Sequence, residues 1–334
     1  EDNMKKKIML TCLLFAITVL SACSNNSTEE PNKEGVLSVY TTVYPLMYLT
    51  EQIGGEYVDV QSVYPAGADE HTFEPTQKNI INMAKSDLFL YIGHNLEGFV
   101  SNAKSILEDE GVKMAAIGER LDLEHIKSAT NEDKAGHDHE QEKAHDHEKD
   151  SAEDHADHNH GDVDPHIWLD PLLTIDMATE IKNELVQLMP EQETSFEENY
   201  QQLVTKLEEL NDAFIETAEH ATKHEIIVSH AAYGYWEQRY GIKEIAVSGL
   251  SSSSEPSQKQ LQNIMETAKE HDIKYVLFEQ NISSKLTEII QKEIGAQALQ
   301  VHNLSVLTES DMENNEDYFT LMYKNIETLQ KALQ

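Results

Sequence analysis

Positively charged side chains are scarce in this 334-residue chain. It contains 25 Lys and Arg residues against 61 Asp and Glu residues, which gives a formal net charge of −36 at pH 7. A nucleic-acid partner requires a basic face that neutralises phosphates, so this balance argues against nucleic-acid binding. An acidic protein instead attracts cations. Because 39% of the residues are hydrophobic, the chain can still bury an ordinary core, and it is long enough for two domains.

The first apolar run is too short to cross a bilayer. It extends from Ile8 to Leu20, and a membrane-spanning helix needs about 20 apolar residues. Lys5 to Lys7 precede the run, and Ser21 and Ala22 follow it. A basic segment, a short apolar segment and a small-residue cleavage site are typical of a secretory signal, so we expect residues 1–22 to be a signal peptide. An uncleaved membrane-anchoring helix is the alternative.

Cysteine is almost absent, since the chain has only Cys12 and Cys23. Cys12 lies inside the expected signal, whereas the sequence LSAC that ends at Cys23 resembles the bacterial lipobox, in which the cysteine is lipidated after cleavage. We therefore predict that Cys23 carries a lipid anchor and that residues 23–35 form a flexible tether. The mature chain would then have no disulfide and no thiolate ligand, so a metal site would have to use His and carboxylate side chains.

Histidine, in contrast, is concentrated in one acidic stretch. Its seven histidines alternate with Asp, Glu and Lys: they are His137, His139, His145, His147, His155, His158 and His160. Neutral imidazoles among carboxylates bind borderline divalent metals, zinc above all, and we predict that these side chains are auxiliary metal ligands. A solvated linker with incidental histidines is the alternative. Few apolar residues offset the entropy of ordering here, so we expect residues 128–162 to be a disordered loop without metal.

Short β-rich runs alternate with amphipathic segments on both sides of this loop. The expected strands are residues 36–40, 58–64, 88–93 and 112–118, then 225–230, 242–249, 275–280 and 298–304. The expected helices are residues 45–55, a segment after Pro75, residues 97–108, 172–188, 256–271, 283–294 and 316–333. Such alternation favours an α/β fold, with mainly parallel sheets that helices cover on both faces.

Between the two series of strands, apolar residues recur with the spacing of a single long helix. They are Phe196, Tyr200, Leu203, Leu207, Leu210 and Phe214. An ordinary packed helix would explain the pattern, but the position of this segment favours a rigid connecting rod. We therefore predict two similar α/β lobes, residues 36–190 and 223–334, joined by a linking helix of residues 191–222.

Three histidines outside the acidic stretch follow the ends of expected strands. His71 lies after the second strand, His166 follows the fourth strand and the loop, and His230 ends the first strand of the second lobe. Ligands of open parallel sheets bind beyond the carboxyl ends of the strands, so we expect these three side chains to meet in a cleft between the lobes. One such histidine is more often an ordinary polar residue, but three placed alike favour a metal site.

Acidic residues close to these histidines could fix the tautomers of the imidazoles. They are Glu70, Glu74, Asp164 and Asp170. The remaining histidines are interpreted as structural or surface residues, and they are His94, His125, His220, His224, His271 and His302.

Four features carry a resemblance to a known family that covers the whole mature chain. They are the segments YPAGADEHTFEPT, DPHIWLDP and VSHAAYGYW and the histidine-rich insertion before DPH. The chain resembles the cluster A-I metal-binding solute receptors of bacterial ABC transporters, and among them the zinc-specific lipoproteins of the ZnuA and AdcA type. The resemblance implies two pseudo-symmetric lobes joined by one long rigid helix, with one metal ion in the cleft. It also implies a zinc-binding protein, not an enzyme, that is lipid-anchored at the extracytoplasmic face of the cell membrane and delivers Zn²⁺ to an ABC permease; we expect a monomer.

By this resemblance, His71, His166 and His230 are the zinc ligands. Manganese receptors of the family carry a carboxylate in place of His230, and three imidazoles suit zinc better than manganese, although a manganese receptor remains the alternative. Relatives supply an acidic fourth ligand near the end of the last strand, where this chain has Ser305. Glu70 is therefore the first candidate for the fourth ligand, and a water molecule is the second.

Two functions of other classes also fit parts of the sequence. Three histidines and a water molecule also describe a zinc hydrolase, but the sequence has no HExxH motif, no GxSxG motif and no cysteine nucleophile in the mature chain. A surface lipoprotein that buffers metal or acts as an adhesin would depend on the loop instead. Deletion of the loop separates the transport receptor from the metal-buffering lipoprotein, because a transport receptor should keep one tight cleft site without the loop.

Overall fold

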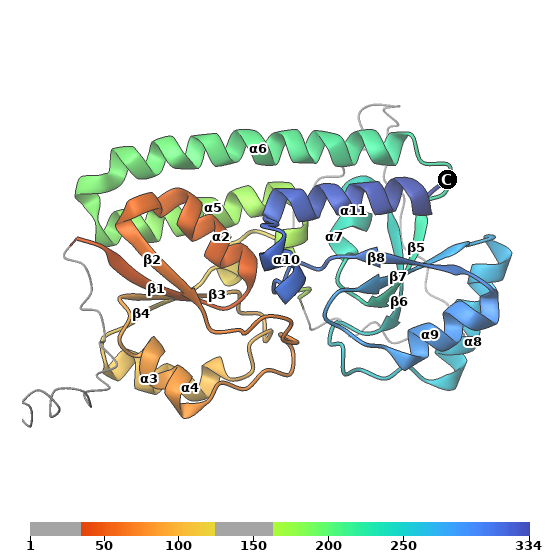
Figure 1. The fold of residues 1–334 in the computed structure, drawn as a ribbon, viewed down its shortest axis with the longest axis horizontal. Helices are drawn as coiled ribbons and strands as arrows, with labels where there is room; N and C mark the ends of the chain where they lie inside the picture. Colours follow the sequence, from red (N-terminus) through yellow and green to blue (C-terminus); the bar gives the residue numbers. More distant parts are fainter. Residues whose placement is uncertain (1–34, 124–162) are drawn as a thin grey trace, which may run out of the picture. The chain divides into compact units, whose positions relative to one another are not determined.

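The computed structural model describes residues 35–123 and 163–334, and within them two four-stranded parallel sheets (Figure 1). The first sheet contains β1 (Leu37–Thr41), β2 (Val58–Ser62), β3 (Leu88–Tyr91) and β4 (Lys113–Ala116). The second contains β5 (Glu225–His230), β6 (Lys243–Ser248), β7 (Tyr275–Glu279) and β8 (Gln297–Val301). The expected signal peptide, Cys23, the tether and the histidine-rich loop lie outside the described residues.

The two sheets have the same topology. Their strand orders are β2-β1-β3-β4 and β6-β5-β7-β8, so in each sheet the first strand in sequence lies between the second and the third. All neighbouring strands pair in parallel, as in the register Leu37 to Val58 and the register His230 to Ser248. In the first sheet the connections after β1 and β3 lead to opposite sides, and in the second sheet those after β5 and β7 do the same. Each sheet therefore has a point beyond its carboxyl edge where the loops diverge and a ligand can bind.

Helices cover both faces of each sheet. One face of the two sheets is covered by α2 (Tyr44–Gly54), α5 (Pro171–Leu188), α6 (Glu193–Glu219) and α11 (Tyr318–Ala332) (Figure 1). The other face of the first sheet is covered by α3 (Gln77–Met83) and α4 (Val100–Asp109). The other face of the second sheet is covered by α8 (Gln258–Glu270) and α9 (Lys285–Ile294). The remaining helices are α7 (Gly234–Tyr240) and α10 (Glu309–Glu313). The predicted α/β fold with two parallel-sheet lobes is confirmed.

Helix α6 is the predicted long connecting helix. Its 27 residues correspond to about 40 Å at 1.5 Å per residue. The apolar stripe is buried at Phe196, Leu203, Leu207, Leu210 and Phe214. This stripe packs against α2, α5 and α11, and the helix thereby contacts elements of both lobes.

The hydrophobic core is continuous between the lobes on the side of α6. One cluster of buried residues includes Phe89 of the first sheet, Leu185 of α5 and Leu277 of the second sheet. A smaller cluster, with Ile227 and Ile264 among its members, lies between the second sheet and helices α8 and α9. The lobes are therefore held together by packing as well as by the linking helix.

Two short helices were not expected from the sequence. Helix α7, GYWEQRY, is rich in aromatic residues, which are moderate helix formers, and it forms where Tyr235 and Trp236 are buried in the core. Helix α10 has only five residues and is fixed by a capping box between Thr308 and Asp311. Within the described part of the chain, no helix combines the length and the apolar character needed to cross a membrane.

Candidate metal centre

The loop after β2 presents Glu70 and His71. It turns sharply because the carboxylate of Asp69 accepts a hydrogen bond from the backbone N–H of His71 (3.0 Å), while the carbonyl of Asp69 accepts one from Phe73 (3.0 Å). The Phe73 ring packs edge-on against Tyr64, with 5.1 Å between the ring centroids. A core aromatic residue therefore anchors the loop on one side of the two candidate ligands.

His166 lies in the segment that leads into α5. The carboxylate of Asp164 accepts hydrogen bonds from the backbone N–H of His166 (3.0 Å) and from its ring Nδ1 (2.8 Å). The next turn, Ile167–Leu169, is buried, and the Trp168 indole donates to the carbonyl of Asn303 in the second lobe (2.7 Å). His166 is thus fixed in position and in ring orientation, and its side chain is completely buried.

His230 is the last residue of β5 and is also completely buried. Its ring Nδ1 lies 2.7 Å from a carboxylate oxygen of Glu279, at the carboxyl end of the neighbouring strand β7. Sequence reasoning did not single out Glu279. The sequence feature that could have identified Glu279 is its position as an acidic residue at the end of an apolar strand, because that strand end lies at the same sheet edge as His230.

The ligand atoms of Glu70, His71, His166 and His230 lie within 4.8 Å of one another. This is the only group of three or more His, Cys, Asp or Glu residues with metal-binding spacing among the described residues. The three imidazole rings stand roughly edge to face, with centroid separations of 5.4, 5.4 and 5.1 Å. The structure thus brings the three predicted histidines and the first candidate for the fourth ligand to one point; their role as ligands stays a prediction.

The polar atoms at this point lack ordinary partners. Among the described residues, neither Oε1 of Glu70 nor Nε2 of His71 has a hydrogen-bond partner, although both atoms are buried. The Nε2 atoms of His166 and His230 face each other at 3.3 Å. Buried polar atoms are almost always satisfied in native proteins, so two unsatisfied atoms beside a pair of facing imidazole nitrogens fit a shared cation.

Burial and mutual repulsion decide the charges of these groups. Burial, together with the nearby His166 and His230, lowers the pKa of His71 to about 3, which keeps this imidazole neutral. Burial also lowers the pKa of His230, but Glu279 outweighs that effect and raises the pKa to about 9. Burial raises the pKa of Glu70. The Nε2 atom of His230 faces that of His166, so a divalent cation bound between the two nitrogens would replace the proton on His230.

Of the other acidic residues proposed to orient the imidazoles, only Asp164 contacts one of the three histidines. Asp164 supports His166 as expected, but Asp170 caps α5 through the backbone N–H of Leu172 (2.8 Å) and forms an ion pair with Arg239 (2.7 Å). Glu74 is exposed. Ser305, which stands where the resemblance implied an acidic ligand, is buried and donates its hydroxyl to Asn303 (2.9 Å).

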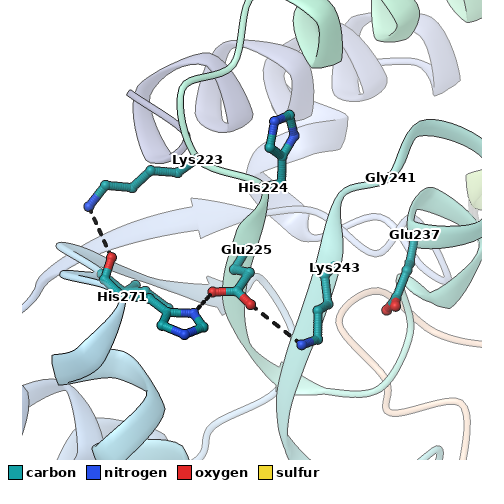
Figure 2. A pocket seen from close by; sticks show the side chains of 8 residues that line it. Lys223, His224, Glu225, Glu237, Gly241, Lys243 and His271 are labelled. Carbon is teal, nitrogen blue, oxygen red and sulfur yellow. Dashed lines mark hydrogen bonds and ion pairs between the residues drawn. The ribbon is translucent and has the colours of Figure 1, made fainter. Parts of the chain in front are cut away.

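A pocket of about 590 Å³ lies at the opposite, amino edge of the second sheet, where β5 and β6 begin. Figure 2 shows the imidazole of His271 directed at the Glu225 carboxylate and the imidazole of His224 directed away from it. Lys243 also pairs with Glu225 (3.4 Å). The carboxylate of Glu225 is therefore bound by neighbouring side chains on two sides, and the interpretation of His224 and His271 as structural or surface residues stays a prediction.

Comparison with known proteins places this geometry in a family. The family model described as zinc-uptake complex component A, periplasmic (ZnuA), matches residues 39–332. The chain belongs to the ZnuA family. High-affinity zinc uptake system protein ZnuA of Bacillus subtilis is 32% identical over 331 residues, which cover 98% of each chain.

Other relatives are longer or have known structures. Zinc-binding protein AdcA of Streptococcus pyogenes is 35% identical over 327 residues, and the matched part is 98% of this chain but 61% of that protein. Among solved structures, the Zn(II)-bound ZnuA-like domain of Streptococcus pneumoniae AdcA has a TM-score of 0.70 at 28% identity, with 90% of this chain and 99% of that chain covered. These similarities confirm the predicted family and its two-lobed fold.

Proposed function

We propose that this chain captures Zn²⁺ outside the cytoplasm and delivers it to an ABC permease in the cytoplasmic membrane. The observation that carries the proposal is the convergence of Glu70, His71, His166 and His230, with ligand atoms within 4.8 Å of one another. Three imidazoles and one carboxylate form a donor set suited to tetrahedral zinc, whereas manganese prefers more oxygen ligands. The names of the relatives, which refer to zinc binding and zinc uptake, support the same cargo.

The burial of the site favours transport over catalysis. His166 and His230 are 0% exposed and Glu70 is 1% exposed. A catalytic zinc keeps one coordination position open for water or substrate, whereas four protein ligands leave none on a tetrahedral ion. Release of the ion then requires the two lobes to separate, because the ligands come from both lobes.

The anchoring of the protein is part of the proposal. We infer that residues 1–22 direct export, that Cys23 carries a lipid and that residues 23–35 tether the folded part of the chain to the membrane. The folded part comprises the lobes 36–190 and 223–334 and the linking helix 191–222. We infer that the protein is a monomer. These terminal residues lie outside the described part of the chain. The support comes from the basic and apolar pattern of the sequence and from relatives named as lipoproteins.

The decisive experiment measures Zn²⁺ and Mn²⁺ dissociation constants by chelator competition on the chain without its leader. We expect one tight zinc site in the cleft and binding of manganese that is weaker by at least two orders of magnitude, because the donor set contains three imidazoles. In zinc-starved cells, replacement of the gene by a His166→Ala copy should also reduce zinc accumulation. Equal affinity for the two metals, or undiminished accumulation with the variant, would reject the proposal.

A further inference from the structure

Asn281, which follows β7 in the second lobe, contacts the ligand-bearing loop of the first lobe. Its side-chain Nδ2 donates to the carbonyl of Ala68 (2.9 Å) and lies 3.3 Å from Oε2 of Glu70. The other oxygen of the same carboxylate, Oε1, is the buried atom without a hydrogen-bond partner. Asn281 therefore donates a hydrogen bond to Oε2 of Glu70, and Oε1 remains available to face the imidazoles.

The orientation of the Asn281 amide is fixed by its neighbours. The backbone N–H of Ser305 donates to the side-chain amide of Asn303 (3.1 Å). Because a backbone N–H can only donate, the end of the amide that it contacts must be the oxygen, Oδ1. The Nδ2 atom of Asn303 then donates to Oδ1 of Asn281 (3.1 Å). The NH₂ end of Asn281 must consequently face Glu70.

This network also explains what Ser305 contributes. Its hydroxyl donates to Asn303 (2.9 Å) and lies 3.4 Å from Nδ2 of Asn281. Asn303 and Ser305 are both 0% exposed, so the network is built into the interior and has little freedom to rearrange. Ser305, which stands where the resemblance implied an acidic ligand, thus belongs to the hydrogen-bond network that contacts the carboxylate of Glu70.

We propose that Asn281 is a positioning residue that holds the Glu70 carboxylate with Oε1 toward the three histidines. Since Asn281 belongs to the second lobe and Glu70 to the first, the carboxylate is oriented only while the lobes are in contact. Separation of the lobes would release this carboxylate and withdraw His230 in one movement. The inference rests on the proposed function, because it assigns a role in the same zinc site.

A double-mutant cycle tests whether Asn281 acts through Glu70. Zinc dissociation constants would be measured by chelator competition for the otherwise complete chain and for Asn281→Leu, Glu70→Gln and the double variant. We expect Asn281→Leu to weaken binding about tenfold, as removal of groups that orient metal ligands does, and to add less than about twofold once Glu70 is already Gln. Asn281→Ser, whose hydroxyl is too short to reach Glu70, should reproduce the loss if the leucine variant folds poorly.

Asn199 provides a matched control. It is also half-buried, and its Nδ2 donates to a backbone carbonyl, that of Ile53, at 3.0 Å, but it lies on α6. Asn199→Leu should bind zinc within twofold of the unmodified chain. Unchanged binding in both Asn281 variants, or losses that add fully to that of Glu70→Gln, would overturn the role of Asn281 alone. Unchanged binding in Glu70→Gln would remove Glu70 from the ligands, and a chain without a tight zinc site would overturn the proposed function itself.

Discussion

Each imidazole of the candidate site comes from a different segment: His71 from the loop after β2, His166 from the segment before α5, and His230 from the end of β5. We expect His71→Ala, His166→Ala and His230→Ala each to weaken zinc binding in the cleft at least tenfold, because a three-imidazole site cannot compensate for a lost ligand. The measurement is chelator competition on chains that lack residues 128–162, so that the loop does not contribute. His220→Ala removes an exposed histidine and should leave the affinity unchanged. An unchanged affinity in any of the three variants would exclude that histidine as a ligand.

Protons and zinc compete for the same nitrogen atoms. An imidazole binds zinc only when it is neutral, so protons compete with zinc at any pH below the pKa of a ligand and the affinity should fall as the pH falls. The pKa of His230 is raised to about 9, so zinc should displace a proton from this residue even at pH 7.5. Calorimetry in buffers of different ionisation enthalpy measures that proton release. A constant affinity between pH 7.5 and pH 5.5 would indicate that carboxylates dominate the site.

At the scale of single elements, Glu184 joins α5 to strand β4 and to the turn that follows this strand. Its carboxylate forms ion pairs with Lys113 of β4 (2.7 Å) and with Arg120 (2.6 Å). Burial raises the pKa of Glu184, but the hydrogen bonds from Lys113 and Arg120 outweigh burial, and the net shift is downward. A carboxylate whose pKa is lower in the folded state stabilises the fold above its unfolded pKa, and this contribution is lost as the pH falls through the folded pKa.

The expected result is a pH-dependent loss of stability in Glu184→Gln. At pH 7 the variant should lose about 1 kcal/mol of the free energy of unfolding, the upper range for partly exposed ion pairs. The difference should shrink as the pH falls below about 4.3, the ordinary pKa of a glutamate. Urea unfolding with a chelator present measures both values. Glu288→Gln changes an exposed carboxylate and serves as the control. A difference that grows on acidification would contradict the assignment.

At the scale of the whole molecule, the cleft is built by packed elements, whereas the histidine-rich residues 128–162 lie outside the described part of the chain. The sequence of this loop offers many ligands, which cannot all hold one tetrahedral geometry without a loss of chain entropy. We therefore expect deletion of residues 128–162 to reduce the stoichiometry to one zinc ion and to leave the affinity of the tight site within about threefold. Uptake should suffer mainly when zinc is scarce, because the loop raises the local concentration of ions near His166.

Titration calorimetry of the complete and the shortened chain tests this expectation. A scrambled loop of the same length and charge, with its seven histidines replaced by Asn, controls for the shortening of the chain. Loss of the tight site on deletion would mean that the loop supplies ligands to the cleft, and the assignment of Glu70 as the fourth ligand would then be wrong.

Much of this architecture could be predicted from the sequence, because it depends on local patterns. Alternating β-rich and amphipathic runs determine the eight strands, and the stripe from Phe196 to Phe214 determines α6. The three histidines could be identified because each lies at or after the end of an expected strand, and the carboxyl ends of parallel strands lie at one edge of a sheet. Helices α7 and α10 were not predicted, since they are short and depend on packing and capping.

Only the tertiary structure decided which groups surround those histidines. Glu279 reaches His230 across 49 residues of sequence, and Asn281 reaches Glu70 across 211 residues. Asp170, whose sequence position beside His166 suggested support of an imidazole, caps a helix and pairs with Arg239 instead. The physical reason is that periodicity and strand ends are properties of neighbouring residues, whereas these hydrogen-bond partners are brought together by the pairing of distant strands and by the packing of the two lobes. The sequence therefore determined the lobes and the three imidazoles, whereas strand pairing brought Glu279 to His230 and the packing of the lobes brought Asn281 to the carboxylate of Glu70.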